Sequence, residues 1–226
     1  MTIALVTGGS AGLGLALTRA LAGRGTTVVT DARSPDALAR IDAPGVVRVA
    51  GDVADPGHRA ALVREAERLG GLDLLVHNAS TLGPLPMRAV RDLSAEELHA
   101  TWEVNVAAPL ELTRALLPAL RRRAGTVLSI TSDAAVESYP TWGAYAATKA
   151  ALERITLTLA AEEEILAYAV DPGDMRTKMH QDAYPGEDIS DRPEPETVVP
   201  ALLALLEQRP PSGRYRAAEL APAGAS

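Results

Sequence analysis

The amino-acid sequence predicts an α/β fold with a doubly wound, mainly parallel sheet and helices on both of its faces. Short apolar runs rich in β-forming residues alternate along the 226-residue chain with stretches whose apolar residues recur at helical spacing. The first run, residues 2–7, leads through a glycine-rich turn directly into such a helical stretch. Strand, turn and helix in this order are typical of parallel sheets, because two parallel strands need a crossover connection between them.

Seven strands are predicted from the apolar runs. They cover residues 2–7, 26–30, 46–49, 72–76, 126–131, 165–170 and 214–218. The first helix has its apolar stripe between Leu13 and Leu21, and Gly23 and Gly25 are its stop signals. The sequence therefore predicts a seven-stranded sheet whose connections are long enough to be helical.

Two later helices have recognisable start signals. Asp55 followed by Pro56 is typical of an N-cap with proline at the first helical position. The segment from Ser94 to Glu97 matches the capping box that begins a helix. The C-terminal part is predicted to contain a last helix over residues 197–207 and a loose tail over residues 220–226.

Length, charge and composition exclude several classes of protein. The length favours one domain with a substantial core, and we expect a single domain over residues 1–226. A formal charge of −7 without a basic stripe argues against nucleic-acid binding. No apolar run approaches the roughly 20 residues that span a bilayer, and the chain starts with a strand instead of a charged leader. Cysteine is absent, so no disulfide can form. We expect a cytoplasmic protein without membrane contact or metal site.

The glycine-rich turn after the first strand is a candidate anion site. Gly8, Gly12 and Gly14 let the backbone approach a ligand, and the following helix presents unpaired N–H groups and the positive end of its dipole. This spacing fits the dinucleotide motif G-x-G-x-x-G badly. The same residues also spell G-x-S-x-G, the nucleophile elbow of α/β-hydrolases, which makes Ser10 an alternative nucleophile.

The hydrolase alternative needs partners for Ser10 further along the chain. An elbow serine works with a downstream acid and a histidine. The histidines available are His58, His77, His99 and His180. No acid stands out as a partner, and an elbow on the very first strand is unusual for that fold. The sequence therefore disfavours a serine hydrolase.

Tyr145 and Lys149 form the motif Y-x-x-x-K. Residues four apart lie on one helical face, so the lysine ammonium group can lie near the phenol. A nearby cation favours the phenolate and lowers the pKa of a tyrosine from its usual value of about 10. Such a tyrosine can exchange protons with a substrate near neutral pH. Ser132, which follows the fifth predicted strand, supplies a second hydroxyl group.

These motifs together resemble those of the short-chain dehydrogenase/reductase family. The resemblance rests on T-G-x-x-x-G-x-G at residues 7–14, on Asn105 and Ser132, and on the tyrosine–lysine motif. It implies a Rossmann-like fold and NAD(P)-dependent hydride transfer between nicotinamide and a small carbonyl or alcohol substrate, with ketone reduction as the expected activity. It also implies a homo-oligomer, a dimer or tetramer. A dinucleotide-sensing protein that keeps the fold without turnover is the alternative.

The resemblance implies a role for each matching residue. Ser132 would hold the substrate oxygen, and Tyr145 would pass it a proton. Lys149 would hold the ribose hydroxyls and tune Tyr145, and Asn105 would anchor a water that links Lys149 to solvent. The implied cofactor contacts are Thr7, Gly8, Ser10, Gly12, Leu13, Gly14, Arg33, Asp52, Val53, Asn78, Lys149, Pro172, Gly173 and Thr177.

Two of these cofactor candidates also have purely structural interpretations. Asp52, which the resemblance places at the adenine edge, can equally be a turn acid before a helix. Asn78 would steady the central strand and the ribose, or would satisfy turn amides at the end of its strand. His77 and Ser80 depart from the family's N-N-A-G pattern around Asn78.

The end of the second strand bears on the choice between NADP and NAD. An acid there binds the 2′-hydroxyl of NAD, whereas an arginine accommodates the 2′-phosphate of NADP. By the resemblance, the discriminating acid falls on Ala32 instead of Asp31, and Arg33 lies where NADP-using members often carry arginine. We expect NADP(H) to be favoured. NAD(H) is the alternative if Asp31 governs, and a turn-capping Asp31 beside a solvated Arg33 is the structural interpretation.

Pro109 predicts a distortion of the helix that carries Asn105. In an α-helix the N–H of residue 109 would bond the carbonyl of residue 105, but proline has no N–H and its ring crowds that carbonyl. The helix should therefore kink near Asn105. The freed carbonyl then needs another partner, which by the resemblance is a water bonded to Lys149.

Residues 178–196 are predicted to form a substrate lid. The segment is polar, acidic and rich in proline and glycine, as loops that cover binding sites often are. The identity of the substrate is not legible from the sequence. An apolar pocket or ordinary core packing would account equally well for Leu82, Tyr139, Trp142, Met175, Met179 and Tyr184.

Overall fold

The computed structural model describes residues 2–220, and its seven strands form one sheet in the order β3-β2-β1-β4-β5-β6-β7. All six neighbouring pairs run parallel. The strands are β1 (Ile3–Val6), β2 (Thr27–Ala32), β3 (Val46–Ala50), β4 (Leu74–His77), β5 (Thr126–Ile130), β6 (Leu166–Asp171) and β7 (Gly213–Arg216). The predicted doubly wound α/β class is confirmed, and most of the predicted tail lies outside the described residues.

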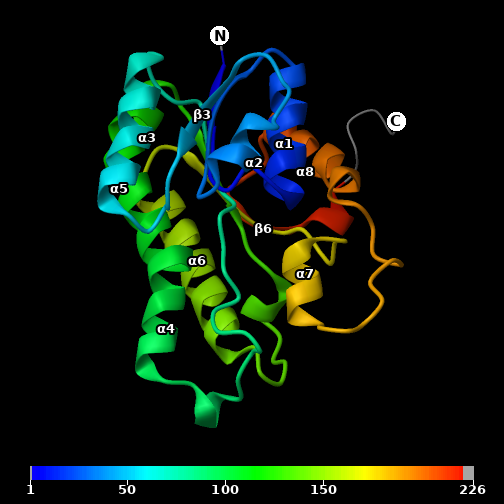
Figure 1. The fold of residues 1–226 in the computed structure, drawn as a ribbon. Coiled ribbons are helices and arrows are strands. Elements are labelled where there is room, and N and C mark those ends of the chain that lie inside the picture. The colour runs from blue at the N-terminus through cyan, green and yellow to red at the C-terminus, as the bar shows by residue number, and fades with distance from the viewer. Residues whose placement is uncertain (1, 221–226) are drawn as a thin grey trace.

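Eight α-helices lie among the described residues (Figure 1). They are α1 (Gly12–Gly23), α2 (Pro35–Ala39), α3 (Pro56–Arg68), α4 (Ala95–Trp102), α5 (Ala108–Arg122), α6 (Gly143–Glu162), α7 (Lys178–Ala183) and α8 (Val199–Gln208). Asp55 caps α3, and the capping box at Ser94 begins α4, as predicted. The sequence analysis missed α2 and α7, although Ser34 before Pro35 and Thr177 before α7 are N-caps of the expected kind.

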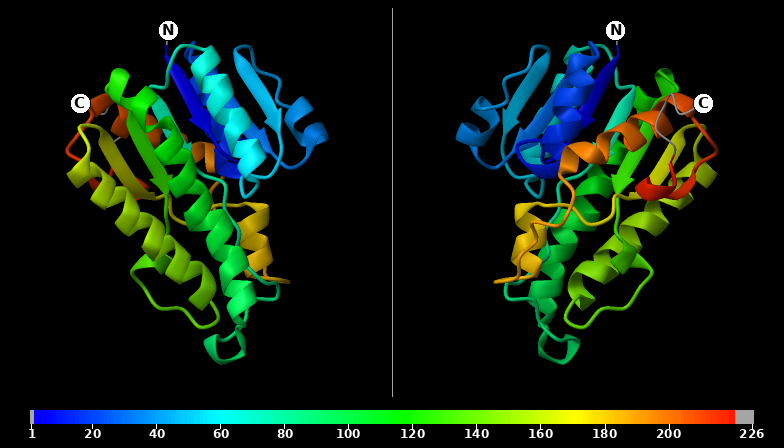
Figure 2. Two further views of the ribbon diagram at one scale, coloured as in Figure 1. Left: turned by 90° about the vertical axis from the view of Figure 1, so that its left-hand side faces the viewer. Right: turned by 90° about the vertical axis from the view of Figure 1, so that its right-hand side faces the viewer.

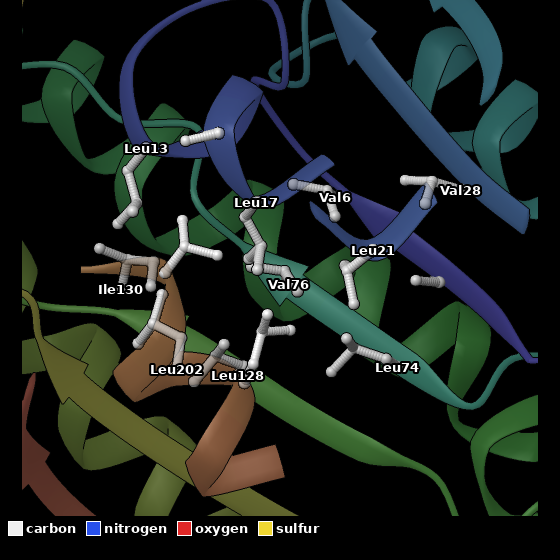
Figure 3. Packing of buried hydrophobic residues seen from close by; sticks show 14 of the residues in the cluster. Val6, Leu13, Leu17, Leu21, Val28, Leu74, Val76, Leu128, Ile130 and Leu202 are labelled. Atoms are coloured by element: carbon white, nitrogen blue, oxygen red, sulfur yellow. The ribbon is translucent and has the colours of Figure 1, made fainter. Parts of the chain in front are cut away.

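Helices cover both faces of the sheet with aliphatic side chains (Figure 2). On one face α1 and α8 pack against the central strands, where Leu17, Val76 and Leu202 meet (Figure 3). On the other face α3 and α5 pack through residues such as Leu62 and Leu116. Strands buried on both faces read as continuous apolar runs, which explains why the strands could be predicted from the sequence.

Strand β1 pairs with β2 on one side and with β4 on the other. The connections therefore reverse direction at β1, and in open α/β sheets ligands bind in the crevice beyond the carboxyl ends of the strands at such a point. The glycine-rich turn follows β1 at this place, and residues 78–81 follow β4 beside it. No helix among residues 2–220 is both long and apolar enough to cross a bilayer.

Candidate active site

The turn between β1 and α1 is packed so closely that two of its glycines admit no side chain. A Cβ on Gly9 would lie 1.9 Å from Thr30 Oγ1, and one on Gly14 would lie 2.4 Å from the backbone oxygen of Gly8. The N-cap residue Ala11 gives no side-chain hydrogen bond to α1, whose first turn carries no acid. The amides that begin α1, including those of Leu13 and Gly14, are thus uncapped by side chains and suited to a phosphate. The turn fits the pyrophosphate of a dinucleotide.

Thr7 and Asn78 fasten the ends of β1 and β4 to each other. Thr7 Oγ1 accepts hydrogen bonds from the backbone N–H groups of Asn78 and Ala79, both at 3.1 Å. Asn78 Nδ2 donates to the backbone oxygens of Thr7 and Gly8 at 2.9 and 3.2 Å. Asn78 therefore steadies the central strands, as one of its two interpretations requires.

Asp31 turns its carboxylate away from the end of β2 and toward the glycine-rich turn. Its Oδ1 accepts the Gly8 N–H at 2.7 Å, and its Oδ2 lies 2.9 Å from Nε2 of His58 on α3. Asp31 and His58 are both buried. Because both carboxylate oxygens are engaged inside the protein, this is the structural role that the sequence left open. Arg33, two residues on, is exposed. The partnership with His58 spans 27 residues and has no local sequence signal.

Three further predicted residues lie in turns at the same end of the sheet. Asp52 accepts the Ala54 N–H at 2.9 Å and so stabilises the turn before α3, while Val53 is buried. On the other side, Thr177 caps α7 by accepting the His180 N–H at 3.1 Å. A Cβ built on Gly12 would lie 3.4 Å from Cγ2 of Thr177. The predicted phosphate turn and the predicted nicotinamide turn therefore face each other.

The turn that follows β6 is held by its own first residue. Asp171 Oδ1 accepts the N–H of Gly173 at 3.0 Å, and Gly173 has a φ of 76°. Glycine adopts this left-handed conformation without the penalty that a side chain brings. The pair Pro172-Gly173 is thereby positioned between β6 and Thr177, as the sequence analysis expects.

Ser132, Tyr145 and Lys149 meet at the carboxyl end of β5. Ser132 directly follows the residue after this strand, and Tyr145 and Lys149 lie one turn apart on α6. Tyr145 is 7% exposed and Lys149 2% exposed. Lys149 Nζ donates to the Ile130 backbone oxygen at 2.8 Å and lies 5.5 Å from the centre of the Tyr145 ring. The structure thus brings the three predicted catalytic residues together.

Burial dominates the acid–base properties of this group. Burial raises the pKa of Tyr145 above its ordinary value, and a hydrogen bond with Ser132 only partly opposes this. Burial also lowers the pKa of Lys149 to about 7. The spacing of Tyr145 and Lys149 predicts a lowered pKa for Tyr145. This prediction is wrong, because the pKa is raised. Loss of water around the phenol is the largest cause, and the charges of Asp133 and Asp171 raise the pKa of Tyr145 further.

Asn105 lies in a π-helical turn, Glu103–Ala107, between α4 and α5. The Ala108 N–H bonds the Glu103 carbonyl, five residues back, as in a π-helix. This is the distortion that Pro109 predicts. The buried Asn105 side chain donates to the Thr81 backbone oxygen at 2.8 Å and to Thr148 Oγ1 at 2.9 Å. The water link to Lys149 stays a prediction.

Two histidines that the sequence left without a role have structural partners. His77 is buried with its Nε2 at 2.7 Å from Thr113 Oγ1, and burial lowers its pKa to about 3. The other is His58, the partner of Asp31. Among the hydrogen bonds of residues 2–220, none joins Ser10 to a histidine. The hydrolase alternative therefore lacks its base.

Charged groups that sequence reasoning missed surround Ser132. Asp133 Oδ1 accepts the Ser132 hydroxyl at 2.8 Å. From β7, Arg214 lies 3.1 Å from the buried Glu153 carboxylate of α6 and 3.6 Å from that of Asp171. Its guanidinium also reaches the Ser132 backbone oxygen at 3.5 Å. Asp133 could have been found from the sequence, because it adjoins Ser132. Arg214, Glu153 and Asp171 come from separate elements that the fold brings together, so no local pattern indicates them.

Comparison with known proteins agrees with this geometry. The family model described as short chain dehydrogenase matches residues 2–188. An uncharacterized oxidoreductase from Schizosaccharomyces pombe is 32% identical over 181 residues, which cover 78% of this chain and 72% of the relative.

Two solved structures share the fold. A short chain dehydrogenase from Pseudomonas syringae has a TM-score of 0.88 and 32% identity, with 95% of this chain and 93% of that chain covered. A short chain dehydrogenase from Shigella flexneri, complexed with NADP, has a TM-score of 0.87 and 28% identity, with 96% and 97% covered. Given the family match over residues 2–188, the chain is an oxidoreductase that belongs to the short-chain dehydrogenase/reductase family.

Proposed function

We propose that this oxidoreductase reduces a small ketone or aldehyde to the alcohol, with NADPH as its preferred hydride donor. The observation that carries the proposal is the geometry around Tyr145, whose buried ring lies 5.5 Å from the buried Lys149 ammonium and whose pKa is raised by burial and partly lowered by the neighbouring Ser132 hydroxyl. The chemistry supplied by the bound nicotinamide is the hydride. The chain's own task is to hold the carbonyl oxygen and protonate it.

Each catalytic residue has a role that its surroundings support. Ser132 donates a hydrogen bond to the substrate oxygen, in place of its hydrogen bond to Asp133, and keeps its proton. Tyr145 gives its phenolic proton to the same oxygen as negative charge develops there. Tyr145 is protonated at neutral pH, because burial raises a pKa that is ordinarily about 10. Lys149 and Asn105 are assigned to the ribose and to a water link with solvent.

The preference for NADPH is supported by the end of β2. Asp31 is bound to Gly8 and His58, so its carboxylate is not directed at a ribose. Arg33 is exposed next to Ala32 and can bind a 2′-phosphate. The Shigella flexneri relative, complexed with NADP, is consistent with this preference.

The remaining assignments extend the same proposal. Cofactor contacts are assigned to Thr7, Gly8, Ser10, Gly12, Leu13, Gly14, Arg33, Asp52, Val53, Asn78, Lys149, Pro172, Gly173 and Thr177. Residues 178–196 are proposed as the lid, because Met179 and Ala183 of α7 pack against the cluster that contains Tyr145. A cytoplasmic homo-oligomer, dimer or tetramer, completes the assignment.

The test is NADPH oxidation with a panel of ketones, with the alcohol product quantified. We expect one alcohol per NADPH oxidised, and a kcat/KM for NADPH at least tenfold above that for NADH. Arg33→Ala should narrow this ratio by about tenfold, since a charge-assisted hydrogen bond is worth about 1.5–3 kcal/mol. Arg40→Ala, at the exposed end of α2, is the matched control and should leave it unchanged. An equal or better kcat/KM with NADH would contradict the NADPH preference.

A further inference from the structure

Aromatic side chains are scarce in this protein, and most of them lie at one place. The chain contains five tyrosines, two tryptophans and no phenylalanine. Trp142 lies at the centre of an aromatic cluster, with its ring 5.9 Å from Tyr139, 5.7 Å from Tyr145 and 5.9 Å from Tyr184. The two sheet faces, by contrast, are packed almost entirely with aliphatic residues. Four of the seven aromatic side chains are therefore gathered around Trp142.

The aromatic cluster reaches both proposed catalytic hydroxyl groups. It contacts Tyr145 through the Trp142 ring and Ser132 through Asp133. The Trp142 and Tyr145 rings meet edge to face, with an interplanar angle of 78°. Tyr139 donates its hydroxyl to Asp133 Oδ2 at 2.8 Å, and the other oxygen of Asp133 accepts the Ser132 hydroxyl at 2.8 Å. A substrate carbonyl held by Ser132 and Tyr145 would consequently have its substituents next to these rings.

Two separate segments of the chain supply the rings. Tyr139 and Trp142 lie in the loop between β5 and α6, whereas Tyr184 ends α7 in the proposed lid. Figure 1 shows α7 beside this loop, at the end of the molecule that lies beyond the carboxyl ends of the strands. Trp142 and Tyr184 are partly exposed, and Tyr139 is 42% exposed. Rings from both segments thus meet at Trp142, which contacts the Tyr145 ring.

We propose, resting on the reductase function above, that the preferred substrates carry an aromatic ring on the carbonyl carbon and that Trp142 and Tyr184 bind this ring. Aromatic rings attract one another in offset-stacked and edge-to-face arrangements beyond the contribution of their buried area. A saturated ring of the same size makes apolar contacts but lacks this attraction. The aromatic cluster therefore selects flat rings over saturated ones.

The experiment compares two ketones that differ only in the saturation of the ring, acetophenone and cyclohexyl methyl ketone. The measured quantity is the ratio of their kcat/KM values in the wild type and in Trp142→Leu. Intrinsic reactivity of the ketones cancels when the two ratios are compared. We expect the acetophenone preference to fall roughly three- to tenfold in Trp142→Leu, the range that aromatic pairing implies. Trp102→Leu is the matched control, because Trp102 lies on α4 outside the aromatic cluster.

A binding measurement complements the kinetics. In Trp102→Leu, Trp142 is the one tryptophan left in the chain, so its fluorescence reports on this site. With NADP⁺ bound, we expect acetophenone to quench this fluorescence saturably and cyclohexyl methyl ketone to do so at least threefold more weakly. Tyr184→Leu, which removes the ring contributed by the proposed lid, should also lower the kcat/KM ratio of acetophenone to cyclohexyl methyl ketone. This variant replaces Trp142→Leu in the test if Trp142→Leu does not fold.

The outcomes separate this inference from the proposed function. Unchanged ratios in both Trp142→Leu and Tyr184→Leu, with turnover of the ketones retained, would overturn the aromatic-substrate inference alone. Absence of turnover by the wild type with any ketone would overturn the reductase function itself. A reduced ratio in the two cluster variants, with none in Trp102→Leu, supports the proposal.

Discussion

At the carboxyl ends of β1, β2 and β4, the predicted cofactor residues bond mainly to backbone groups, whereas at the ends of β5 and β6 backbone contacts and side-chain contacts are mixed. Thr7, Asn78 and Asp31 all bond to main-chain N–H or C=O groups of the glycine-rich turn. Ser132 instead meets the Asp133 carboxylate, and Trp142 meets the ring of Tyr184. The proposed cofactor end is thus held largely by backbone groups, whereas side-chain contacts contribute more at the proposed substrate end.

This difference indicates how one fold can keep a cofactor and change its substrate. At the cofactor end, a new side chain on Gly9 or Gly14 would collide with atoms at 1.9 and 2.4 Å. At the proposed substrate end, Trp142 and Tyr184 have φ angles of −86° and −123°, which any residue other than proline can adopt. Mutations should therefore alter cofactor binding at the first end and turnover or selectivity at the second.

The largest expected effect is on turnover, at the substrate end. Tyr145→Phe removes the proton donor and should lower kcat by roughly 10²–10⁴-fold. The NADPH dissociation constant, measured by fluorescence, should change by less than a few-fold. Tyr215→Phe on β7, whose hydroxyl bonds the Pro211 carbonyl, is the control and should retain normal kcat. A Tyr145→Phe enzyme with more than a tenth of the wild-type kcat would refute the assignment of the acid.

At the cofactor end, Gly14→Ala should weaken NADPH binding at least tenfold. The added Cβ would lie 2.4 Å from both Asn78 Nδ2 and the Gly8 backbone oxygen. Overpacking of this kind costs about 1–3 kcal/mol, so the melting temperature should fall by roughly 3–10 °C. Gly23→Ala, where no atom lies within 4 Å of the new Cβ, should leave both quantities near wild type. Unchanged NADPH affinity in Gly14→Ala would show that the turn can accommodate the added Cβ by a small shift.

His77, at the end of β4 beside β5, should make the free energy of unfolding depend on pH. Burial lowers its pKa from 6.5 to about 3, helped by the charge of Lys149. The unfolded chain then binds the proton more readily, so this contribution is complete above pH 6.5 and is lost as pH falls toward 3. In that window the loss is about 1.4 kcal/mol per pH unit.

Urea unfolding at pH 7 and pH 5 measures this contribution. The wild type should lose about 2 kcal/mol more than His77→Asn, in which the titrating group is absent. His99→Asn is the matched control, since His99 is exposed on α4. Equal losses in wild type and His77→Asn would mean that His77 is protonated in the folded protein.

The smallest expected effect is that of Asp31→Asn. Asparagine can accept the Gly8 N–H and still bond to His58, so the turn should keep its geometry. NADH affinity should stay within twofold of wild type. If Asp31 bound ribose hydroxyls, the loss of a charged hydrogen bond would weaken NADH binding by about tenfold or more. Isothermal titration decides between these results, with Asp36→Asn on the exposed first turn of α2 as control.

What could be predicted from the sequence follows the same division. The strands, the glycine-rich turn and the Tyr145–Lys149 spacing are local patterns, because each depends on residues close together in the chain. A distortion near Asn105 could likewise be predicted, since Pro109 removes a known hydrogen bond, but the structure shows a π-helical turn instead of the expected kink. Local patterns therefore located most of the site.

The contacts that the sequence did not predict join distant segments. Asp31 meets His58 across 27 residues, and Arg214 meets Glu153 across 61. The direction of the Tyr145 pKa shift also depended on burial, which the spacing of Tyr145 and Lys149 does not reveal. Long-range partners and desolvation require the folded chain.

The most direct test of the proposed reductase function is transfer of deuterium from NADPH labelled at both C4 positions of the nicotinamide. With acetophenone as substrate, we expect 1-phenylethanol that carries one deuterium on the carbinol carbon, formed in proportion to enzyme and time. Mass spectrometry measures the deuterium content of the alcohol directly, so the result does not depend on a rate constant. Saturable NADPH binding without labelled alcohol from acetophenone or any other ketone would contradict the account and would identify a dinucleotide-binding protein without turnover.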